Sequence, residues 1–496
     1  MSISVDSPIP PLADVPARRT NFRLPPPRDP MKASPLYSSI TLLAALCSSR
    51  FASAQGASTE PPDAISGAPT PAIDAAPPRS VDPRVDELDQ KVRIIERRWE
   101  VEQEVQAARK EEERKNPASV PFAHGKDGAG IKSADGKFQF RLRPLIQTDG
   151  RFYISENTNT FLLRRVRPVL EGTIFDFFDW RIMPELAGTP NVQDAYGNVR
   201  LIKEVQFRGG KFKAPVGLER LASDADLPFV ERGLPTQLVP DRDVGIQVHG
   251  DLLESTLTYA IGLFNGVGDA VNGDVDNSDK KDWDGRIVVR PFQPTTLEPL
   301  RGLGLGIAGT RGTQTGPLPG YRTSGQATFF QYAEGVRGSG THRRLAPQAF
   351  YYYGPVGIFG EYTVSSQIVA GPIGHERVDH QAWQVVGSFF VTGEEASYTT
   401  VTPKHQLDPK NRTIGAIELV ARYGELHLDE GAFDKQFADP TKSARTARAW
   451  GVGLNWHLAR NFKLMADYER THFDGGGKAG DRPHEIVVLT RLQAAY

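Results

Sequence analysis

Cysteine is nearly absent from this sequence, and neither sign of charge dominates it. Cys47 is the single cysteine among 496 residues, and 59 basic residues face 60 acidic ones, for a net charge of -1. One cysteine excludes an intramolecular disulfide. The charge balance excludes bulk nucleic-acid binding, because a dedicated binder carries a basic excess over a whole domain. No uninterrupted apolar run reaches about 18 residues, which excludes a membrane-spanning helix but not a spanning barrel, whose strands are short and half apolar.

The chain begins with the features of a secretion signal. Met31 and Lys32 precede an apolar core at residues 40–47, and Ala52-Ser53-Ala54 offers a small-residue cleavage site. This order is typical of a signal peptide. We expect cleavage after Ala54, which removes Cys47 and leaves a mature chain without thiol chemistry. The sequence leaves open whether translation starts at Met1 or at Met31.

Two linkers and a helix follow residues 1–54. Residues 55–83 are rich in Ala, Pro and Ser, which cannot bury a core and are typical of a flexible linker. Residues 84–115 predict a short coiled coil, because Val85, Leu88, Val92, Ile95 and Trp99 recur at alternating steps of three and four. So short a seam implies association, most simply with copies of itself; one solvated charged helix is the alternative. Residues 116–137 form a second linker.

From residue 138 to residue 496 the hydrophobic period becomes two. Phe138, Phe140, Leu142 and Ile146 share one face of a strand, and polar residues occupy the other. The same alternation returns along the chain and is clearest in its last residues, which end at Tyr496. A terminal aromatic residue on such a strand is the signal read by the barrel assembly machinery of the outer membrane.

The strands are numerous enough to close a barrel. We count about sixteen in roughly 360 residues, an even number as in bacterial outer-membrane barrels, and short connections alternate with longer ones. The fold class predicted is all-β: a transmembrane antiparallel β-barrel of about 16 strands, preceded by a short α-helical coiled coil. A soluble β-sandwich is the alternative, but it does not explain the signal sequence, the even count and Tyr496 together.

Several motifs resemble the phosphate-selective porin O and P family. They lie at residues 210–219 (GKFKAPVGLE), 240–245 (PDRDVG), 259–266 (YAIGLFNG), 391–394 (VTGE), 451–456 (GVGLNW) and 491–496 (RLQAAY). Six motifs in this order over about 360 residues make the resemblance fairly specific, although it does not cover the linkers or the coiled coil. The resemblance implies a trimeric sixteen-stranded outer-membrane barrel, an inward-folded third loop, and passive anion transport through an arginine-lined pore.

The polar faces of the strands independently indicate an anion path. Assigning these faces to the lumen places fourteen basic residues there against nine acidic ones. Arginine and lysine rings select anions in pores, and the guanidinium fork matches phosphate. Opposed basic and acidic rows that merely screen one another are the alternative. The predicted anion-binding residues of the lumen are Arg141, Arg143, Arg165, Arg167, Arg181, Arg208, Lys211, Lys213, Arg220, Arg232, Arg344 and Arg422.

Residues 214–241 correspond to the long third external loop. Gly209-Gly210 before it permits a β-bulge that would turn Lys211 and Lys213 toward the lumen. Only Arg220 and Arg232 are basic within the loop, and no lysine cluster of the kind associated with the family's phosphate site occurs there. General anion preference is therefore better supported than phosphate specificity.

Motifs for catalysis or metal binding are incomplete. His375 and His380 are five residues apart, in what we interpret as a loop, and so lack the spacing of a zinc-protease helix. Residues 125–133 lack the lysine of a phosphate-binding P-loop, and residues 274–279 lack the glycine and glutamate of a calcium loop. We expect no enzyme activity, no catalytic residue, no metal and no cofactor.

Two functions remain, and they are compatible. The first is an outer-membrane porin for passive diffusion of small anions such as phosphate or polyphosphate. The second is a structural barrel that tethers the outer membrane to the cell wall through a periplasmic coiled coil. The expected partners are small inorganic anions, outer-membrane lipid, two further copies in a homotrimer, and the barrel assembly machinery.

Overall fold

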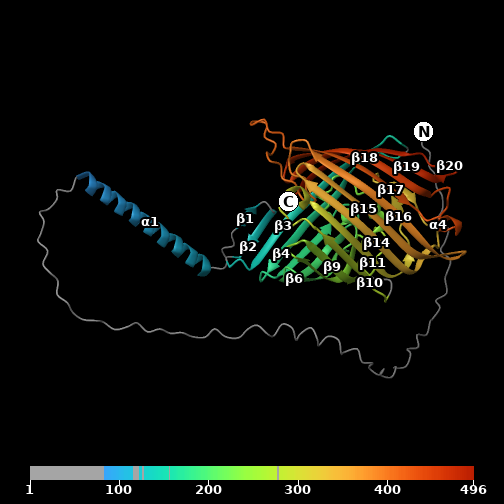
Figure 1. The fold of residues 1–496 in the computed structure, drawn as a ribbon, viewed down its shortest axis with the longest axis horizontal. Coiled ribbons are helices and arrows are strands. Elements are labelled where there is room, and N and C mark those ends of the chain that lie inside the picture. The colour runs from blue at the N-terminus through green and yellow to red at the C-terminus, as the bar shows by residue number, and fades with distance from the viewer. Residues whose placement is uncertain (1–82, 116–121, 126–127, 134, 156, 276–278) are drawn as a thin grey trace, which may run out of the picture. The chain divides into compact units, whose positions relative to one another are not determined.

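The computed structural model describes residues 83–115, 122–125, 128–133, 135–155, 157–275 and 279–496 (Figure 1). The signal peptide, its cleavage site and nearly all of the first linker lie outside the described residues. The elements in chain order are α1 (Pro83–Lys115), β1 (Phe122–Gly125), β2 (Gly128–Lys132), β3 (Phe138–Tyr153), β4 (Thr160–Ile174), β5 (Phe178–Glu185), β6 (Asn191–Ile202), β7 (Val205–Lys213), α2 (Leu218–Leu221), η1 (Leu234–Leu238), β8 (Arg242–Leu252), β9 (Leu257–Phe264), β10 (Asp282–Val289), α3 (Glu298–Arg301), β11 (Leu303–Pro317), β12 (Tyr321–Arg322), β13 (Thr328–Phe330), β14 (Arg337–Tyr353), β15 (Val356–Gly371), β16 (Gly374–Phe390), β17 (Ala416–His427), α4 (Gly431–Asp434), β18 (Ala444–Ala459), β19 (Phe462–Gly477), β20 (Gly480–Asp481) and β21 (Glu485–Ala495).

The strands β3 to β11, β14 to β19 and β21 form a closed antiparallel barrel of sixteen strands, as predicted. Each strand pairs with its neighbour in the chain, and β21 closes the ring by pairing with β3, with Thr490 opposite Gly150. Closure matters because it leaves no unpaired edge. The hairpin of β1 and β2 continues the wall beside β3, where Ala129 lies opposite Leu142.

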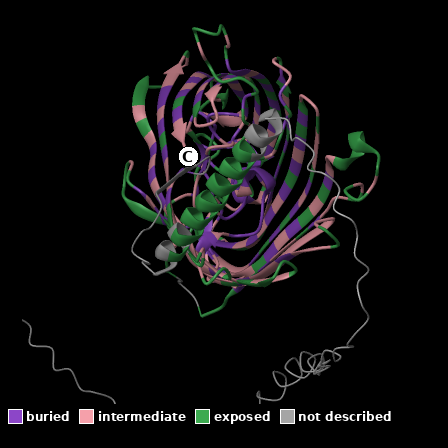
Figure 2. Ribbon diagram, turned by 90° about the vertical axis from the view of Figure 1, so that its left-hand side faces the viewer, coloured by how far each residue is buried: buried purple, intermediate pink, exposed green. Residues whose placement is uncertain are grey.

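The wall shows the alternation that the sequence predicts. In β17, Glu418, Val420 and Arg422 are buried inside the ring, while Leu419 and Tyr423 are exposed on its outer face. Figure 2 shows this alternation as bands of different burial along the strands. Apolar side chains on the outside and polar ones inside are the reverse of a soluble barrel. None of the helices in the described part of the chain is long and apolar enough to cross a membrane.

The two ends of the barrel differ in their connections. One end, which we call the turn end, has short links such as Gly354-Pro355 and residues 460–461. The other end, the loop end, has longer links such as residues 214–241 and 318–336. Three connections break this expected asymmetry. Residues 372–373 make a tight turn at the loop end, and residues 290–302 and 391–415 make long connections at the turn end.

An apolar core occupies one side of the lumen at its loop end. Leu234 and Leu238 of η1 pack there with Phe330, Phe437 and Leu426, from two other connections and from β17. The core lies against the inner faces of β15 to β19, where alternation alone would place polar groups. This core takes up part of the lumen, so the polar groups that a passing solute needs lie beside it.

Candidate anion path through the lumen

The connection between β7 and β8, residues 214–241, folds into the barrel and is called here the inner loop. Its irregular backbone is bonded to the wall on several sides, as buried polar groups require. The amide of Leu218 donates to Glu361 Oε2 at 2.7 Å, and that of Val230 donates to Asp467 Oδ2 at 2.6 Å. The side chains of Gln147 and Lys463 donate to carbonyls of the same loop at 2.9 and 3.1 Å. The inner loop therefore crosses the lumen as a fixed constriction.

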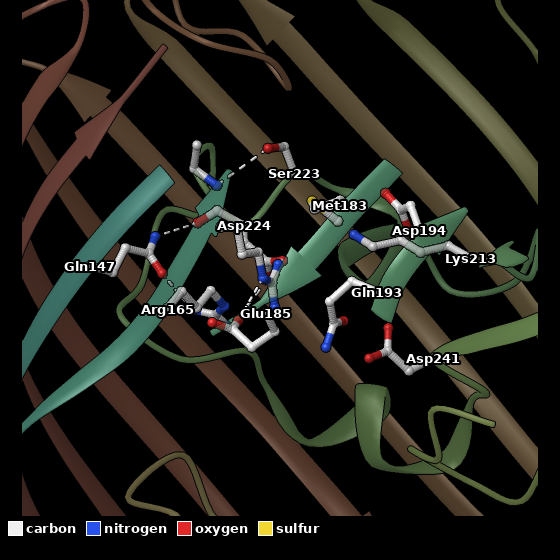
Figure 3. A network of polar contacts seen from close by, with 12 residues as sticks. Gln147, Arg165, Met183, Glu185, Gln193, Asp194, Lys213, Ser223, Asp224 and Asp241 are labelled. Carbon is white, nitrogen blue, oxygen red and sulfur yellow. Dashed lines mark hydrogen bonds and ion pairs between the residues drawn. The ribbon is translucent and has the colours of Figure 1, made fainter. Parts of the chain in front are cut away.

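Asp224 is the centre of the charged contacts that hold the inner loop (Figure 3). Its carboxylate pairs with Arg165 on β4 at 3.2 Å, with Arg167 on β4, with Arg232 in the loop itself at 2.5 Å, and with Arg242 on β8 at 4.0 Å. Burial alone would raise the pKa of this carboxyl, but the guanidinium groups of Arg165, Arg232 and Arg167 hold it well below its ordinary value. Asp224 is therefore ionised at every physiological pH.

A second acidic residue of the inner loop, Glu231, is held from another side. Its carboxylate accepts from Arg164 Nη2 at 3.1 Å and pairs with Arg151 at 3.4 Å. Burial raises the pKa of Glu231, but the charge of Arg164 and its hydrogen bond lower that pKa by a larger amount. The net shift of the Glu231 pKa is therefore far downward. Arg422 Nη1 donates to the Glu231 carbonyl at 2.9 Å, and its guanidinium lies 4.3 Å from the Phe229 ring centroid. These contacts hold the loop, and none of these residues lines the cavity described next.

A cavity of about 410 Å³ lies beside the inner loop, toward the turn end of the barrel. Eight basic residues and four acidic residues line it. The basic residues are Arg143, Arg167, Arg181, Arg208, Lys213, Arg242, Arg460 and Lys463, and the acidic ones are Asp194, Asp224, Asp226 and Glu418. The residues Leu145, Tyr196, Phe212 and Tyr496 contribute apolar and aromatic surface. The cavity therefore has a basic excess within a chain that is neutral as a whole.

Arg208 on β7 is held in this cavity by aromatic rings. Its guanidinium carbon lies 4.6 Å from the ring centroid of Tyr196 and 5.4 Å from that of Phe212. Among the described residues no carboxylate oxygen lies within 4 Å of this guanidinium, unlike those of Arg167 and Arg181. Stacking engages the faces of the guanidinium and leaves its N–H edge able to donate. Lys213 is similar, since its Nζ donates to the Ala222 carbonyl at 2.6 Å.

The long turn-end connection, residues 391–415, also reaches this cavity; we call it the turn-end segment. Ser397, Thr399, Thr400 and Val401 line the cavity. Thr400 Oγ1 donates to Asp226 Oδ1 of the inner loop at 2.7 Å, and the Tyr398 hydroxyl donates to the Leu218 carbonyl. The lumen is therefore narrowed from both ends by segments that contact one another.

The twelve predicted lumen residues separate into groups. Five of them, Arg143, Arg167, Arg181, Arg208 and Lys213, line the cavity. Arg165, Arg220 and Arg232 lie in or against the inner loop, where carboxylates or carbonyls hold them. Arg141 pairs with Glu171 at 3.5 Å, Arg344 with Asp269 at 2.7 Å, and Arg422 with Glu469 at 2.6 Å, all away from the cavity lining. Most of these arginines thus have a structural partner.

Two expectations about local structure are wrong. The pairing of β7 with β6 and β8 runs without a register shift through Gly209 and Gly210, so the expected bulge is absent there, and Lys211 pairs with Asp274 instead of lining the cavity. A bulge would have required an extra unpaired residue. His375 and His380 lie in β16 and not in a loop, because the turn before them is only two residues long.

Sequence reasoning missed several residues of the path. Arg164 falls on the outward face by simple alternation, but a register shift between Gln147 and Thr148 turns it inward. Arg242 and Arg460 line the cavity and were not among the predicted residues. Both lie at strand ends, where alternation no longer assigns a face. Among the described residues no group of three or more His, Cys, Asp or Glu side chains could hold a metal ion.

Comparison with known proteins agrees with this geometry. The family model "Phosphate-selective porin O and P" matches residues 139–496. The chain belongs to this porin family. Porin O of Pseudomonas aeruginosa is 22% identical over 412 residues, which cover 75% of this porin and 91% of the relative. The family and the closed barrel place this porin in the outer membrane.

The chain is also similar to solved structures of outer-membrane channels. The outer membrane channel DcaP of Acinetobacter baumannii has a TM-score of 0.50 and 10% identity, covering 76% of this porin and 100% of that chain. An anion-selective porin from Comamonas acidovorans has a TM-score of 0.44 and 12% identity, covering 73% of this porin and 100% of that chain. At such identities the likeness to DcaP establishes the barrel architecture alone.

Proposed function

We propose that this porin carries small anions by passive diffusion through the cavity beside the inner loop. The observation that carries this proposal is the lining of that cavity, where eight basic residues outnumber four acidic ones. A local basic excess in a narrow, low-dielectric passage attracts anions and repels cations. Membership of the phosphate-selective porin O and P family supports the same direction.

Within the cavity, Arg208 and Lys213 are the proposed contacts for a passing anion. No carboxylate engages the Arg208 guanidinium among the described residues, and the Lys213 ammonium donates to a carbonyl. Arg167 and Arg181, in contrast, already pair with carboxylates at 2.7 and 3.1 Å. These donors can bind phosphate, and they can also bind other small oxyanions and chloride. The described groups include no dedicated lysine cluster that would favour phosphate over the others.

The zero-current potential of the refolded porin in a planar bilayer tests this function. Under a potassium chloride gradient, an anion path gives a potential of the sign set by chloride, and added phosphate reduces the chloride current in a saturable way. A potential set by potassium, or an absence of conductance, would contradict the proposal. The concentration of phosphate that half-blocks the chloride current then distinguishes a general anion path from one that binds phosphate tightly.

We further propose that α1 lies in the periplasm and associates with two copies of itself in a homotrimer. Val92, Ile95 and Trp99 lie on one stripe of this helix and are 48%, 66% and 67% exposed, as an unpartnered seam would be. A tether to the cell wall remains the second candidate function, because a charged helix of 33 residues has the length to reach beyond the membrane. Deleting residues 83–115 separates the two roles: conductance survives in both cases, and envelope anchoring is lost only if the tether exists.

The last strand is the proposed contact for the barrel assembly machinery. Tyr496 follows β21 directly; its amide donates to the Pro144 carbonyl at 3.1 Å, and its side chain is half exposed. Removing its aromatic ring with Tyr496→Ser should lower the amount of porin assembled in cells. The refolded variant should still conduct and keep its anion selectivity, because Tyr496 lines the cavity but has no charged side chain. Normal assembly of this variant would contradict the proposed role.

A further inference from the structure

The Asp224 carboxylate occupies a nest of arginines that we define as Arg165, Arg167, Arg232 and Arg242. Figure 3 labels Asp224 and the first of these arginines, Arg165. Both partners in each pair are almost fully buried, with side-chain exposures between 4% and 10%. The nest is assembled from β4 and from a later stretch of the chain, the inner loop together with the first residue of β8. One short carboxylate therefore holds four guanidinium groups together.

The charges of the nest are balanced only while Asp224 is ionised. Arg167 has a further partner in Glu185 at 2.7 Å, and Arg242 has two, Asp194 at 2.9 Å and Asp241 at 3.0 Å. Within the described residues, however, Asp224 is the single carboxylate partner of Arg165 and of Arg232. In addition, the buried Arg165 Nε has no hydrogen-bond partner. Without the Asp224 charge, Arg165 and Arg232 would have no described carboxylate partner, and Arg165 would keep its unused buried donor, so the position would suit an anionic oxygen from solution.

This nest opens onto the anion path. Asp224, Arg167 and Arg242 line the cavity, as do the neighbouring Ser223 and Ala225. An anion in the cavity therefore meets the arginine nest from the side on which Asp224 lies. The Asp224 backbone is fixed, because its carbonyl accepts from Gln147 Nε2 at 2.9 Å. The carboxylate thus stands in the position that an inorganic oxyanion would take against these guanidinium groups.

We propose that Asp224 is a tethered counter-ion that sets how strongly this porin holds phosphate. Its carboxylate occupies the arginine nest and repels the oxyanion that would otherwise bind there. Anions then pass along Arg208 and Lys213 without being retained. This inference rests on the proposed anion path and adds the residue that determines its affinity for phosphate.

The substitution Asp224→Asn tests the inference, because the amide has nearly the same shape but no charge. Chloride current through the refolded porin is measured in a planar bilayer while inorganic phosphate is added. We expect the half-blocking concentration of phosphate to fall by at least about tenfold, because a unit charge within 4 Å of the binding position is removed from a poorly screened site. The variant Asp224→Ser, which also removes the charge but leaves more room, should show the same direction.

Glu231→Gln is the matched control. It removes one negative charge from the same inner loop and also frees two arginines, Arg151 and Arg164, but Glu231 is not among the cavity residues. We expect its half-blocking concentration to stay within about threefold of the unsubstituted porin, since the charge lies away from the path. This control distinguishes an effect of the charge at the position of Asp224 from an effect of loosening the inner loop.

The outcomes distinguish the two proposals. If the unsubstituted porin is anion-selective and neither Asp224→Asn nor Asp224→Ser tightens phosphate block, the counter-ion role is wrong and the anion path stands. An equal tightening in Glu231→Gln would also overturn it, because the effect would then be one of total charge. If the unsubstituted porin prefers potassium, the anion path itself fails.

Discussion

Arg208 differs from the other cavity arginines in what holds it. Tyr196 and Phe212 support its guanidinium, and no described carboxylate lies within ion-pairing distance. Such stacking contributes about 0.5–2 kcal/mol and does not neutralise the charge. The field of Arg208 in the cavity is therefore less compensated than that of Arg167, which is paired with both Glu185 and Asp224.

Substituting Arg208 should consequently change ion selectivity more than stability. We expect Arg208→Gln to shift the zero-current potential toward potassium and to raise the half-blocking concentration of phosphate about three- to tenfold, the loss of one charge-assisted contact. The control is Arg448→Gln on β18, which removes an arginine that is 43% exposed and lies outside the cavity lining. An unchanged potential in Arg208→Gln would exclude this residue from the anion path.

At the scale of elements, the ion pairs of the inner loop should make its attachment insensitive to mild acid. The pKa of Asp224 and that of Glu231 both lie below their ordinary values of 3.8 and 4.5. A lowered pKa in the folded state means that the stabilisation is complete above the ordinary value and is lost only as the pH falls through the lower one. Between pH 7 and pH 5 neither pair should weaken.

Hydrogen exchange measures this directly. Amides of residues 214–241 should keep the same protection at pH 7 and pH 5, once intrinsic exchange rates are corrected. Protection should be lost first in Glu231→Gln, in which Arg151 and Arg164 lose their common carboxylate. Loss of protection in the unsubstituted porin by pH 5 would mean that these carboxyls take up protons above their ordinary pKa values and do not fix the loop as ion pairs.

The turn-end segment makes a separate prediction. Within residues 397–401, Thr400 donates a hydrogen bond to Asp226, and Tyr398 donates one to the Leu218 carbonyl. Side chains of the same residues narrow the cavity. Replacing these five residues by Gly and Ser should raise single-channel conductance, because the side chains leave the path, and should preserve anion selectivity, because none of them is charged. The substitution Thr400→Val, which removes one hydrogen bond worth about 1 kcal/mol, should have little effect on conductance. Unchanged conductance after replacement would place the segment outside the path.

The sequence predicted the wall of this barrel better than its interior. Alternation predicted the inward faces of Arg165 and Arg167 on β4, and the structure buries both in the lumen. It missed Arg164, since a register shift depends on the pairing with β3 and not on β4 alone. It also could not reveal that Asp224 joins Arg165 to Arg242, because those contacts depend on the folded course of the inner loop.

At the scale of the whole molecule, the lumen is divided into an apolar core and a polar cavity, and the sequence pattern does not reveal this division. Val369, Val378 and Leu426 face inward and are fully buried in the apolar core at the loop end. Apolar residues on the inward face make both faces of a strand apolar. They therefore obscure the apolar–polar alternation by which a porin strand, with its usually polar lumen face, is recognised in a sequence. Their partners, such as Phe330 and Phe437, come from connections whose course has no period to detect. The arginines and the cavity are therefore confined to the space that this core leaves.

Assembly is the remaining property of the whole molecule that the helix α1 should govern. The exposed stripe of Val92, Ile95 and Trp99 can be buried only by a partner, and each large apolar side chain contributes about 1.5–3 kcal/mol when fully buried. Three copies brought together by three barrels meet at a high effective concentration, which favours a seam too short to associate alone. We therefore expect the double substitution Ile95→Asp and Trp99→Asp to lower the temperature at which the trimer dissociates in detergent. Conductance per channel should stay the same, because neither residue lies in the cavity lining.

A matched pair of changes off this stripe distinguishes association from general effects of charge. Glu96→Gln and Arg93→Gln alter charge on the same helix without touching the apolar residues, and should leave the dissociation temperature unchanged. If Ile95→Asp with Trp99→Asp also leaves it unchanged, α1 does not bind its copies, and the barrels alone must hold the trimer. The exposed stripe would then require a different partner, and the tether to the cell wall would become the better explanation of the helix, since an apolar seam of this length in water remains unfavourable until something covers it.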